Sequence, residues 1–306
     1  ELNYAKIVAN HVRSLHFDKK LRKDDIKNII FDMVYFQDEP ISDPVCVPIF
    51  YVSKLAKENN VKVCQVGEGA DELFFGYTNW YRTSKIDSVL NNILFPNFLK
   101  KLILAVYKKF NLQYKYTSDL LKRSLENRPI FWGGAEAFSS FEKNELFSNK
   151  FKKRIKKIDS WECIKPFSDY FNKKAKYKSI ENWMTYLDLK IRLPELILMR
   201  IDKMTMANSL EARVPFLDHQ LVQKTIDLPK KVKIKNNKLK SLLKDIVKDL
   251  LPEEILNRKK QGFGLPLKEW FEEGLGIDEK KIINEFVSKT DFFDKNCIRK
   301  IINRKG

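Results

Sequence analysis

The feature that most constrains the fold is a short apolar run leading into a glycine-rich acidic turn, VKVCQVGEGADELFFGY over residues 61–77. Its apolar and β-branched residues, with a turn signal on each side, predict a strand over residues 61–66. Gly67 and Gly69 allow a sharp turn, and the acidic residues behind them favour a helix start near Ala70. A strand that ends in glycine and feeds a helix is typical of the carboxyl edge of a parallel α/β sheet, where ligands bind.

The rest of the chain predicts mostly helices. Hydrophobic periodicity predicts one strand candidate at 15–17, a proline-containing loop over 37–48, a helical break near Pro194, and helices within 4–13, 24–36, 49–59, 85–127, 136–160, 179–200 and 237–250. The predicted fold class is therefore α/β, in one domain over residues 1–306. A parallel-sheet portion takes residues 1–85, and a large, mainly helical portion takes residues 86–306.

Composition and charge exclude several classes of protein. A chain of 306 residues with 43% hydrophobic residues can bury a substantial core. Its four cysteines have no C-x-x-C spacing, so neither a disulfide framework nor a zinc site is predicted. No apolar run is long enough to span a membrane, and no signal peptide is visible. We therefore expect a cytoplasmic protein.

The net charge of +18 is compatible with nucleic-acid binding. The lysines are spread along the whole chain, however, which is typical of a solvated surface. We expect no nucleic-acid partner, and keep a basic nucleic-acid-binding module without catalysis as the alternative from another class.

Two carboxylates at the start of the predicted helix indicate which ligand this turn could bind. Glu68 and Asp71 are three residues apart, so they can point the same way, and two anions would repel a phosphate unless Mg²⁺ lay between them. The dinucleotide pattern G-x-G-x-x-G fails because its third position is Glu72, and the chain contains no P-loop. Two readings stay open on these residues alone: a metal–phosphate site, or an acidic helix cap.

Four motifs in order favour the first reading. They are DEPISDPVCVP at residues 38–48, VGEGADELFFGY at 66–77, DKMTMANSLEARVPFLD at 202–218 and RKKQGFGLP at 258–266. Together they resemble the synthetase domain of glutamine-dependent asparagine synthetases, most closely the branch often found among polysaccharide-biosynthesis genes. The resemblance covers essentially the whole chain, and it implies an adenine-nucleotide fold of the PP-loop ATPase type.

The resemblance also implies a reaction. These ligases use ATP and Mg²⁺ to adenylate a carboxylate, with aspartate as the first expectation, and ammonia from a glutaminase domain converts the acyl-adenylate to an amide. Val66, Gly67 and Gly69 would contact the nucleotide, and Asp71 would hold the metal. Glu68 would act on the proton that the attacking ammonia sheds. Lys260 would be the catalytic lysine that stabilises charge on the phosphates.

Departures from the family pattern limit these expectations. The Ser-Gly-Gly-x-Asp-Ser-Ser pyrophosphate loop and the cysteine-initiated glutaminase half do not occur in this sequence, and Val66 stands where Ser is usual. We therefore expect an internal piece of a longer polypeptide, truncated at both ends and inactive alone. A sugar-acid or peptide carboxylate remains the alternative acceptor, and a homodimer is the assembly that we allow for.

The same motifs suggest supporting residues. Asp38, Glu39 and Asp43 are candidates for the substrate entrance. Arg213 is expected to bind a nearby carboxylate and to fix the turn before Pro215.

Overall fold

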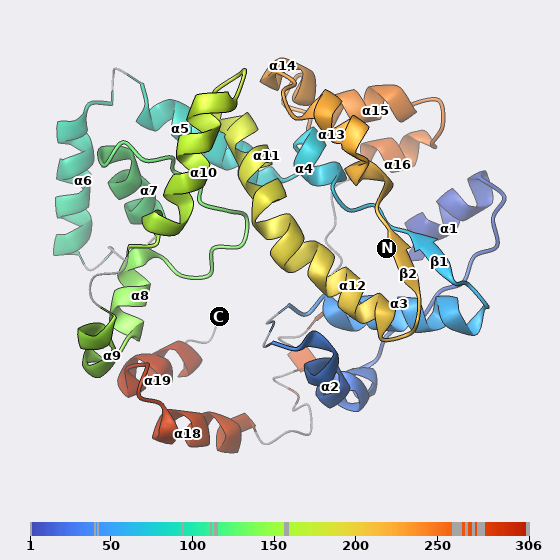
Figure 1. Cartoon of the computed structure of the whole chain (residues 1–306), viewed down its shortest axis with the longest axis horizontal. Coiled ribbons are helices and arrows are strands. Elements are labelled where there is room, and N and C mark those ends of the chain that lie inside the picture. The colour runs from blue at the N-terminus through green and yellow to red at the C-terminus, as the bar shows by residue number, and fades with distance from the viewer. Residues whose placement is uncertain are drawn as a thin grey trace. The chain divides into compact units, whose positions relative to one another are not determined.

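The computed structural model describes residues 2–39, 41, 43–92, 95–110, 112, 116–155, 159–258, 265–266, 269–270, 273 and 279–303. The chain forms two compact units, each built from two stretches of sequence (Figure 1). Unit 1 comprises Glu1–Tyr77 and Leu189–Ile277, and unit 2 comprises Thr78–Asp188 and Asp278–Gly306. A boundary at residue 85 marks where the strand signal fades, whereas the compact units depend on which segments pack together.

Unit 1 carries the two described strands. Its elements are α1 (Leu2–His11), α2 (Lys23–Gln37), α3 (Cys46–Glu58), β1 (Val63–Gln65), α4 (Ala70–Phe74), a π-helical segment (Leu193–Leu198), α12 (Met199–Met206), β2 (Glu211–Arg213), a 3₁₀ turn (Pro215–Leu217), α13 (His219–Thr225), α14 (Lys230–Lys233), α15 (Ser241–Val247) and α16 (Glu253–Asn257).

The two strands form a parallel sheet, as the sequence predicts for residues 61–66. Val63 pairs with Glu211 and Gln65 with Arg213, and the backbone N–H of Val66 continues the ladder to the Arg213 carbonyl at 2.8 Å. α4 begins at Ala70, where the acidic turn predicts a helix start. The α/β fold class is therefore confirmed, with helices dominating a small parallel sheet.

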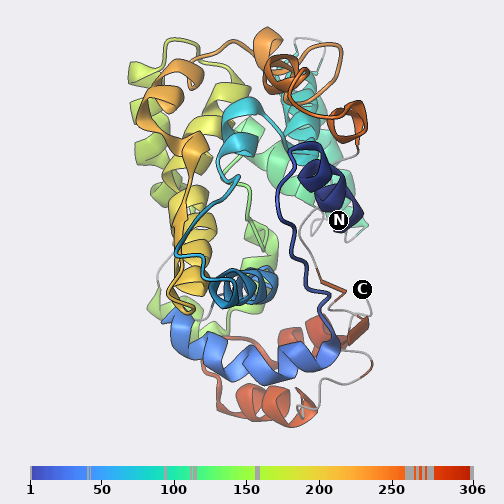
Figure 2. The same ribbon diagram turned by 90° about the vertical axis from the view of Figure 1, so that its right-hand side faces the viewer.

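Three helices supply one core of unit 1. Ile26 and Ile29 of α2 pack with Cys46 and Val47 of α3 and with Met204 of α12, and all five are buried. Figure 2 shows α3 end-on, with α2 running across it and α12 beside it. Burying a side chain of this size contributes about 1.5–3 kcal/mol, so this cluster anchors α12 and the strand that follows it.

A second core lies where α12 meets the sheet. Leu193, Ile197 and Ile201 are buried, and Val66 and Ala212 pack against them. The turn after β1 therefore rests on the segment that leads into α12.

The structure corrects two details of the predicted secondary structure and confirms a third. Residues 15–17 are not a strand. α3 begins at Cys46, three residues before the predicted start, because a proline such as Pro48 is tolerated within the first turn of a helix. The predicted break near Pro194 is confirmed as a π-helical segment joined directly to α12.

In the part of unit 2 that the structure describes, the regular secondary structure is helical, apart from an isolated bridge between Phe147 and Phe293. Its helices are α5 (Thr78–Leu90), α6 (Asn97–Lys109), α7 (Tyr116–Leu125), α8 (Ser140–Leu146), α9 (Asn149–Arg154), α10 (Trp161–Lys174), α11 (Ile180–Lys190, which crosses the boundary at residue 188), α18 (Glu279–Lys289) and α19 (Lys295–Asn303).

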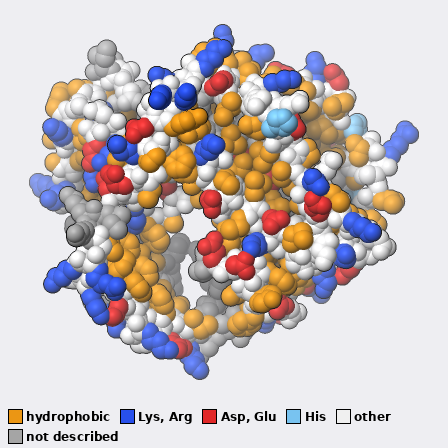
Figure 3. Space-filling view, in the orientation of Figure 1, with side chains coloured by type: hydrophobic (Ala, Val, Ile, Leu, Met, Phe, Trp, Pro, Cys, Tyr) orange, Lys and Arg blue, Asp and Glu red, His pale blue; other side chains and the backbone are white. Residues whose placement is uncertain are grey.

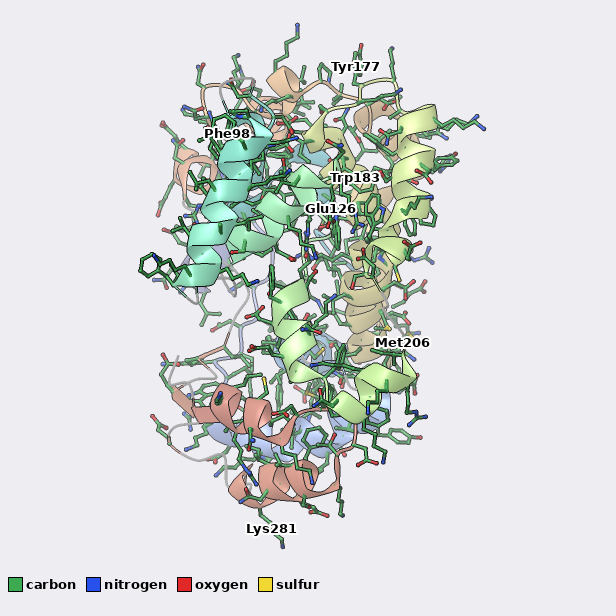
Figure 4. The ribbon with its side chains drawn as sticks, turned by 90° about the vertical axis from the view of Figure 1, so that its left-hand side faces the viewer. Phe98, Glu126, Tyr177, Trp183, Met206 and Lys281 are labelled. Atoms are coloured by element: carbon green, nitrogen blue, oxygen red, sulfur yellow. The ribbon has the colours of Figure 1, made fainter. Side chains whose placement is uncertain are left out.

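Aromatic packing organises the part of unit 2 around α11. Trp183 is buried (Figure 4) and packs on Phe171 of α10, with ring centroids 5.4 Å apart. Its indole N–H donates to the Phe131 carbonyl at 2.8 Å. The buried ring therefore has both an apolar neighbour and a hydrogen-bond acceptor.

A buried ion cluster centres on Arg123 of α7. Its guanidinium binds Asp119 at 2.8 Å and Glu136 at 2.5 Å, donates to the Ile130 carbonyl at 2.8 Å, and lies 3.8 Å from the centre of the Trp132 ring. The Arg123 side chain is 4% exposed and that of Asp119 is 1% exposed. Removing one partner would leave buried charges unpaired, so the cluster depends on this arginine.

None of the helices that the structure describes is long and apolar enough to cross a membrane.

Arg123→Met should destabilise the chain by about 3–5 kcal/mol, because the buried carboxylate of Asp119 and the partly buried carboxylate of Glu136 lose their cation. Urea unfolding followed by circular dichroism measures the change. Arg128→Met is the matched control: Arg128 pairs with Asp159 at 2.7 Å but is 22% exposed, so its loss should cost less than about 1 kcal/mol. Equal costs for the two variants would contradict the structural role given to Arg123.

Candidate functional site

The turn between β1 and α4 uses its two glycines differently. Gly69 has φ +91°, a conformation that side chains rarely adopt, and a Cβ there would lie 2.3 Å from a methyl carbon of Leu217. At Gly67 no heavy atom lies within 4 Å of where a Cβ would be. Gly69 is therefore required for the turn itself, whereas Gly67 leaves its backbone accessible to a ligand.

A cavity of about 360 Å³ opens beside this turn, within unit 1. Val66 and Glu68 line it from the turn, and the other walls come from β1, from α3 and the residue before it, from α12, and from the residue before β2. Most lining side chains are apolar, including Val45, Ile49, Val52, Ile201 and Leu210. A concave apolar space with a few charged groups is the usual form of a small-molecule site.

Glu68 and Arg200 are the charged residues in the cavity lining. Burial raises the pKa of Glu68; the charge of Arg200 opposes the rise, and the charges of Glu72 and Asp71 add to it. Arg200 forms an ion pair with Asp43. Asp43 also accepts from the Val45 backbone N–H at 3.0 Å, so the start of α3 fixes this pair.

Asp71 lies in the first turn of α4 and pairs with a lysine that sequence reasoning missed. Its Oδ1 is 2.8 Å from Nζ of Lys240, the residue before α15. Gly76 packs against the pair, and its backbone N–H donates to the Asp71 carbonyl at 2.8 Å. The contact between α4 and α15 brings these residues together, although 169 positions separate them and no motif marks Lys240.

Glu72, the next carboxylate, turns to a different environment. It is 1% exposed, and it accepts from the Tyr77 hydroxyl at 2.6 Å. Arg192 lies 3.9 Å from its Oε1 and 4.7 Å from the centre of the Tyr77 ring. Burial and the charge of Glu72 raise the pKa of Tyr77. This group holds α4 in place.

The structure thus brings five of the six predicted site residues, Val66, Gly67, Glu68, Gly69 and Asp71, into one turn. The sixth, Lys260, lies outside the described residues. Sequence reasoning did not identify Arg192, Arg200, Lys240 or Tyr77 as neighbours of that turn. In a chain rich in arginine and lysine, the sequence does not show which carboxylate a given arginine or lysine will contact.

The side chains near the turn determine whether the protein could hold a metal ion there. Among the described residues, no group of three His, Cys, Asp or Glu side chains could hold an ion by themselves. Mg²⁺ is usually held by one or two carboxylates together with substrate phosphates, and Asp71 fits that limited role. A protein-only metal centre does not fit the described residues.

The motif over residues 202–218 has a structural role here. Asp218 caps α13 by accepting from the backbone N–H of Gln220 at 2.9 Å. Arg213 contacts Glu211 at 2.8 Å, and both side chains are exposed. Ala212, between them, faces the core below the sheet.

The fold and the site first define a class: an α/β protein with a carboxylate-bearing glycine turn at the carboxyl end of a parallel strand. A protein-family model described as asparagine synthase matches residues 1–306. The chain therefore belongs to the asparagine synthase family.

Curated relatives agree with this family. The chain is 34% identical over 293 residues to asparagine synthetase [glutamine-hydrolyzing] 1 of Bacillus subtilis, covering 96% of this chain and 44% of the relative. It is 30% identical over 274 residues to a putative asparagine synthetase [glutamine-hydrolyzing] of Mycobacterium tuberculosis H37Rv, covering 90% and 40%. Amidase chyE of Penicillium rubens is 23% identical over 316 residues, covering 93% and 44%. The chain thus spans less than half the length of these relatives.

Gly69→Ala should destabilise the chain by about 1–3 kcal/mol, because it adds both a strained backbone and a contact with Leu217. Gly67→Ala is the control in the same turn and should change stability by less than about 0.5 kcal/mol. Urea unfolding of both variants measures the difference. A larger loss for Gly67→Ala would refute the separate roles of the two glycines.

Glu68→Gln should stabilise the folded chain at neutral pH. The folded state raises the pKa of Glu68, so the folded state binds this proton more tightly than the unfolded state. The resulting stability is fully present below the ordinary pKa of about 4.3 and is lost as pH rises through the folded value. Glutamine cannot ionise, so the stability difference should shrink toward pH 4. Urea midpoints from pH 4 to 7.5 measure it, and a Gln variant less stable at neutral pH would contradict the expectation.

Proposed function

We propose that this chain is the synthetase part of an ATP-dependent, amide-forming ligase. Aspartate is the proposed acceptor: its side-chain carboxylate is adenylated with release of pyrophosphate, and ammonia derived from glutamine then displaces AMP to give asparagine. The observation that carries the proposal is the β1–α4 turn, where an accessible glycine backbone, an apolar cavity and two carboxylates in different environments meet.

Several residues of the turn suit the binding of ATP. The apolar cavity beside Val66 can receive a flat base, and the open backbone at Gly67 allows close approach of a ligand. Asp71 is the residue proposed to hold Mg²⁺, which would neutralise charge on the phosphates. Lys240 supplies a positive charge beside Asp71.

Glu68 suits the second half of the reaction. Ammonia attack on an acyl-adenylate must release a proton, and a carboxylate with a raised pKa accepts a proton more readily near neutral pH. Arg200, fixed by Asp43, lies beside it in the cavity lining and can orient an anionic substrate. Lys260 remains the proposed phosphate-binding lysine by family resemblance.

The full reaction belongs to the full-length protein, since the relatives that carry glutamine hydrolysis in their names are more than twice as long as the matched region. A glutaminase domain would supply the ammonia, the cytoplasm is the proposed location, and a homodimer is the assembly to test. A sugar-acid or peptide carboxylate is the alternative acceptor. A nucleic-acid module is less well supported: Figure 3 shows Lys and Arg scattered over the visible face, with Asp and Glu between them.

Asp71→Asn and Glu68→Gln in the full-length protein should fail in different steps. Asp71→Asn weakens the metal–phosphate contact, so ATP–pyrophosphate exchange that depends on aspartate should fall. Glu68→Gln keeps that contact but removes the base, so amide formation should fall by about 10²–10⁴-fold and at least as far as exchange. Isotope exchange and asparagine release measure the two steps.

Equal and mild losses in both assays for both variants would mean that these residues only cap α4. Exchange that depends on a sugar acid and not on aspartate would replace the proposed acceptor while keeping the reaction type.

A further inference from the structure

The outer side of α6 exposes an apolar stripe. Phe98, Leu102 and Val106 follow one another at intervals of four residues, so they lie along one side of the helix. They are 67%, 58% and 44% exposed, and Phe110, directly after the helix, is 64% exposed. Figure 4 shows α6 at the edge of unit 2, with Phe98 labelled in its first turn. A row of large apolar side chains in water marks an interaction surface.

The opposite side of α6 already belongs to the core of unit 2. Ile103 and Leu104 pack against a buried cluster that contains Leu120 of α7. Lys100 is buried as well, and its Nζ donates to the Ser124 hydroxyl at 2.9 Å. The inner side therefore fixes the helix in place, and the apolar stripe is free to meet a partner.

The charges around the stripe have one sign. α6 packs against α7, and over the described residues of these two helices the exposed charged side chains are all lysines: Lys101, Lys108, Lys109 and Lys122. Asp119, the acidic residue of α7, is buried against Arg123. Lysines beside an apolar stripe can lay their stems along an apolar phase and keep their ammonium groups at its polar boundary. This face therefore suits a partner that is apolar inside and anionic at its surface.

An anionic lipid surface fits this face better than another protein does. In a symmetric pair of α6 helices, lysines would meet lysines, because α6 contains no carboxylate and that of α7 is buried. A different protein would need a groove that receives the helix. A lipid interface takes an amphipathic helix lying flat, with apolar side chains among the acyl chains and lysines level with the head groups. α6 lies at the edge of unit 2 in both Figure 1 and Figure 4, as such a contact requires.

We propose that α6 is a membrane-surface anchor, in which Phe98, Leu102 and Val106 enter the head-group boundary of an anionic phospholipid bilayer and the neighbouring lysines bind its phosphates. The contact is peripheral and reversible, so it requires no helix that crosses the bilayer. Its residues belong to unit 2, whereas the β1–α4 turn belongs to unit 1. The inference therefore does not depend on the proposed reaction.

Vesicle flotation with the full-length protein tests the anchor. Vesicles made of equal parts of phosphatidylglycerol and phosphatidylcholine should carry the protein upward. Vesicles of phosphatidylcholine alone should bind it about tenfold or more weakly, because each lysine near an anionic surface contributes about 1 kcal/mol, or about fivefold in affinity. Added salt should weaken binding to the anionic vesicles, since it screens the lysines from the phosphates.

Variants of α6 separate the apolar and the charged contributions. Phe98→Gln and Leu102→Gln should each weaken binding to anionic vesicles about tenfold, because a large apolar side chain no longer leaves water. Lys101→Gln combined with Lys108→Gln should weaken it by about tenfold or more. These side chains are exposed, so circular dichroism and thermal unfolding should show that each variant folds like the unaltered protein.

Tyr170→Gln is the matched control. Tyr170 is 56% exposed on α10, which lies apart from α6 in both Figure 1 and Figure 4 and carries acidic as well as basic residues. This variant should leave vesicle binding unchanged. An equal loss in Tyr170→Gln and Phe98→Gln would mean that binding is not localised to α6, and it would overturn the inference.

Two further results would also overturn it. The first is that the full-length protein does not float with anionic vesicles, as expected if another part of the polypeptide covers α6. The second is that Phe98→Gln changes the oligomeric state in analytical ultracentrifugation without changing vesicle binding, which would make α6 an interface between copies. The proposed function is tested separately, by carboxylate-dependent ATP–pyrophosphate exchange in solution without vesicles.

Discussion

Backbone hydrogen bonds between β1 and β2 are the interaction on which the candidate site depends. The strands are short, with Val63–Gln65 paired to Glu211–Arg213, and the ladder ends at the bond from the Val66 N–H to the Arg213 carbonyl. This pairing joins segments almost 150 residues apart and holds the glycine turn beside Leu217, whose side chain fills the space next to Gly69. Without this strand pairing, the glycine turn would not be held beside Leu217.

The three carboxylates of this motif, Glu68, Asp71 and Glu72, lie in three different environments. Glu68 faces an apolar cavity, where burial favours its protonated form. Asp71 meets Lys240 at the side of α4, and Glu72 is buried against Tyr77. A buried carboxylate is costly unless it is paired or hydrogen-bonded, so the three environments differ: they suit the proposed proton exchange at Glu68, the proposed metal binding at Asp71, and a structural role for Glu72.

Local signals predicted the parts of the fold that depend on local physics. The strand near residue 63 and the helix start at Ala70 follow from β-branched residues, glycine and acidic residues within one short window. The three residues 15–17 were predicted as a strand and are not one, because a short apolar run becomes a strand only when another strand is there to pair with it. The second strand, Glu211–Arg213, was not anticipated, since two charged residues flank a single alanine that faces the core.

The sequence by itself determined the family, the glycine turn and the carboxylates Glu68 and Asp71, because these lie in contiguous motifs whose spacing is visible in one dimension. Only the tertiary structure decided which cations those carboxylates meet. Arg200 reaches the cavity beside Glu68 through the packing of α12 on α3, and Lys240 reaches Asp71 through the contact of α15 with α4. Such partners are set by the packing of distant helices, and a lysine-rich sequence gives no sign of which lysine will be placed.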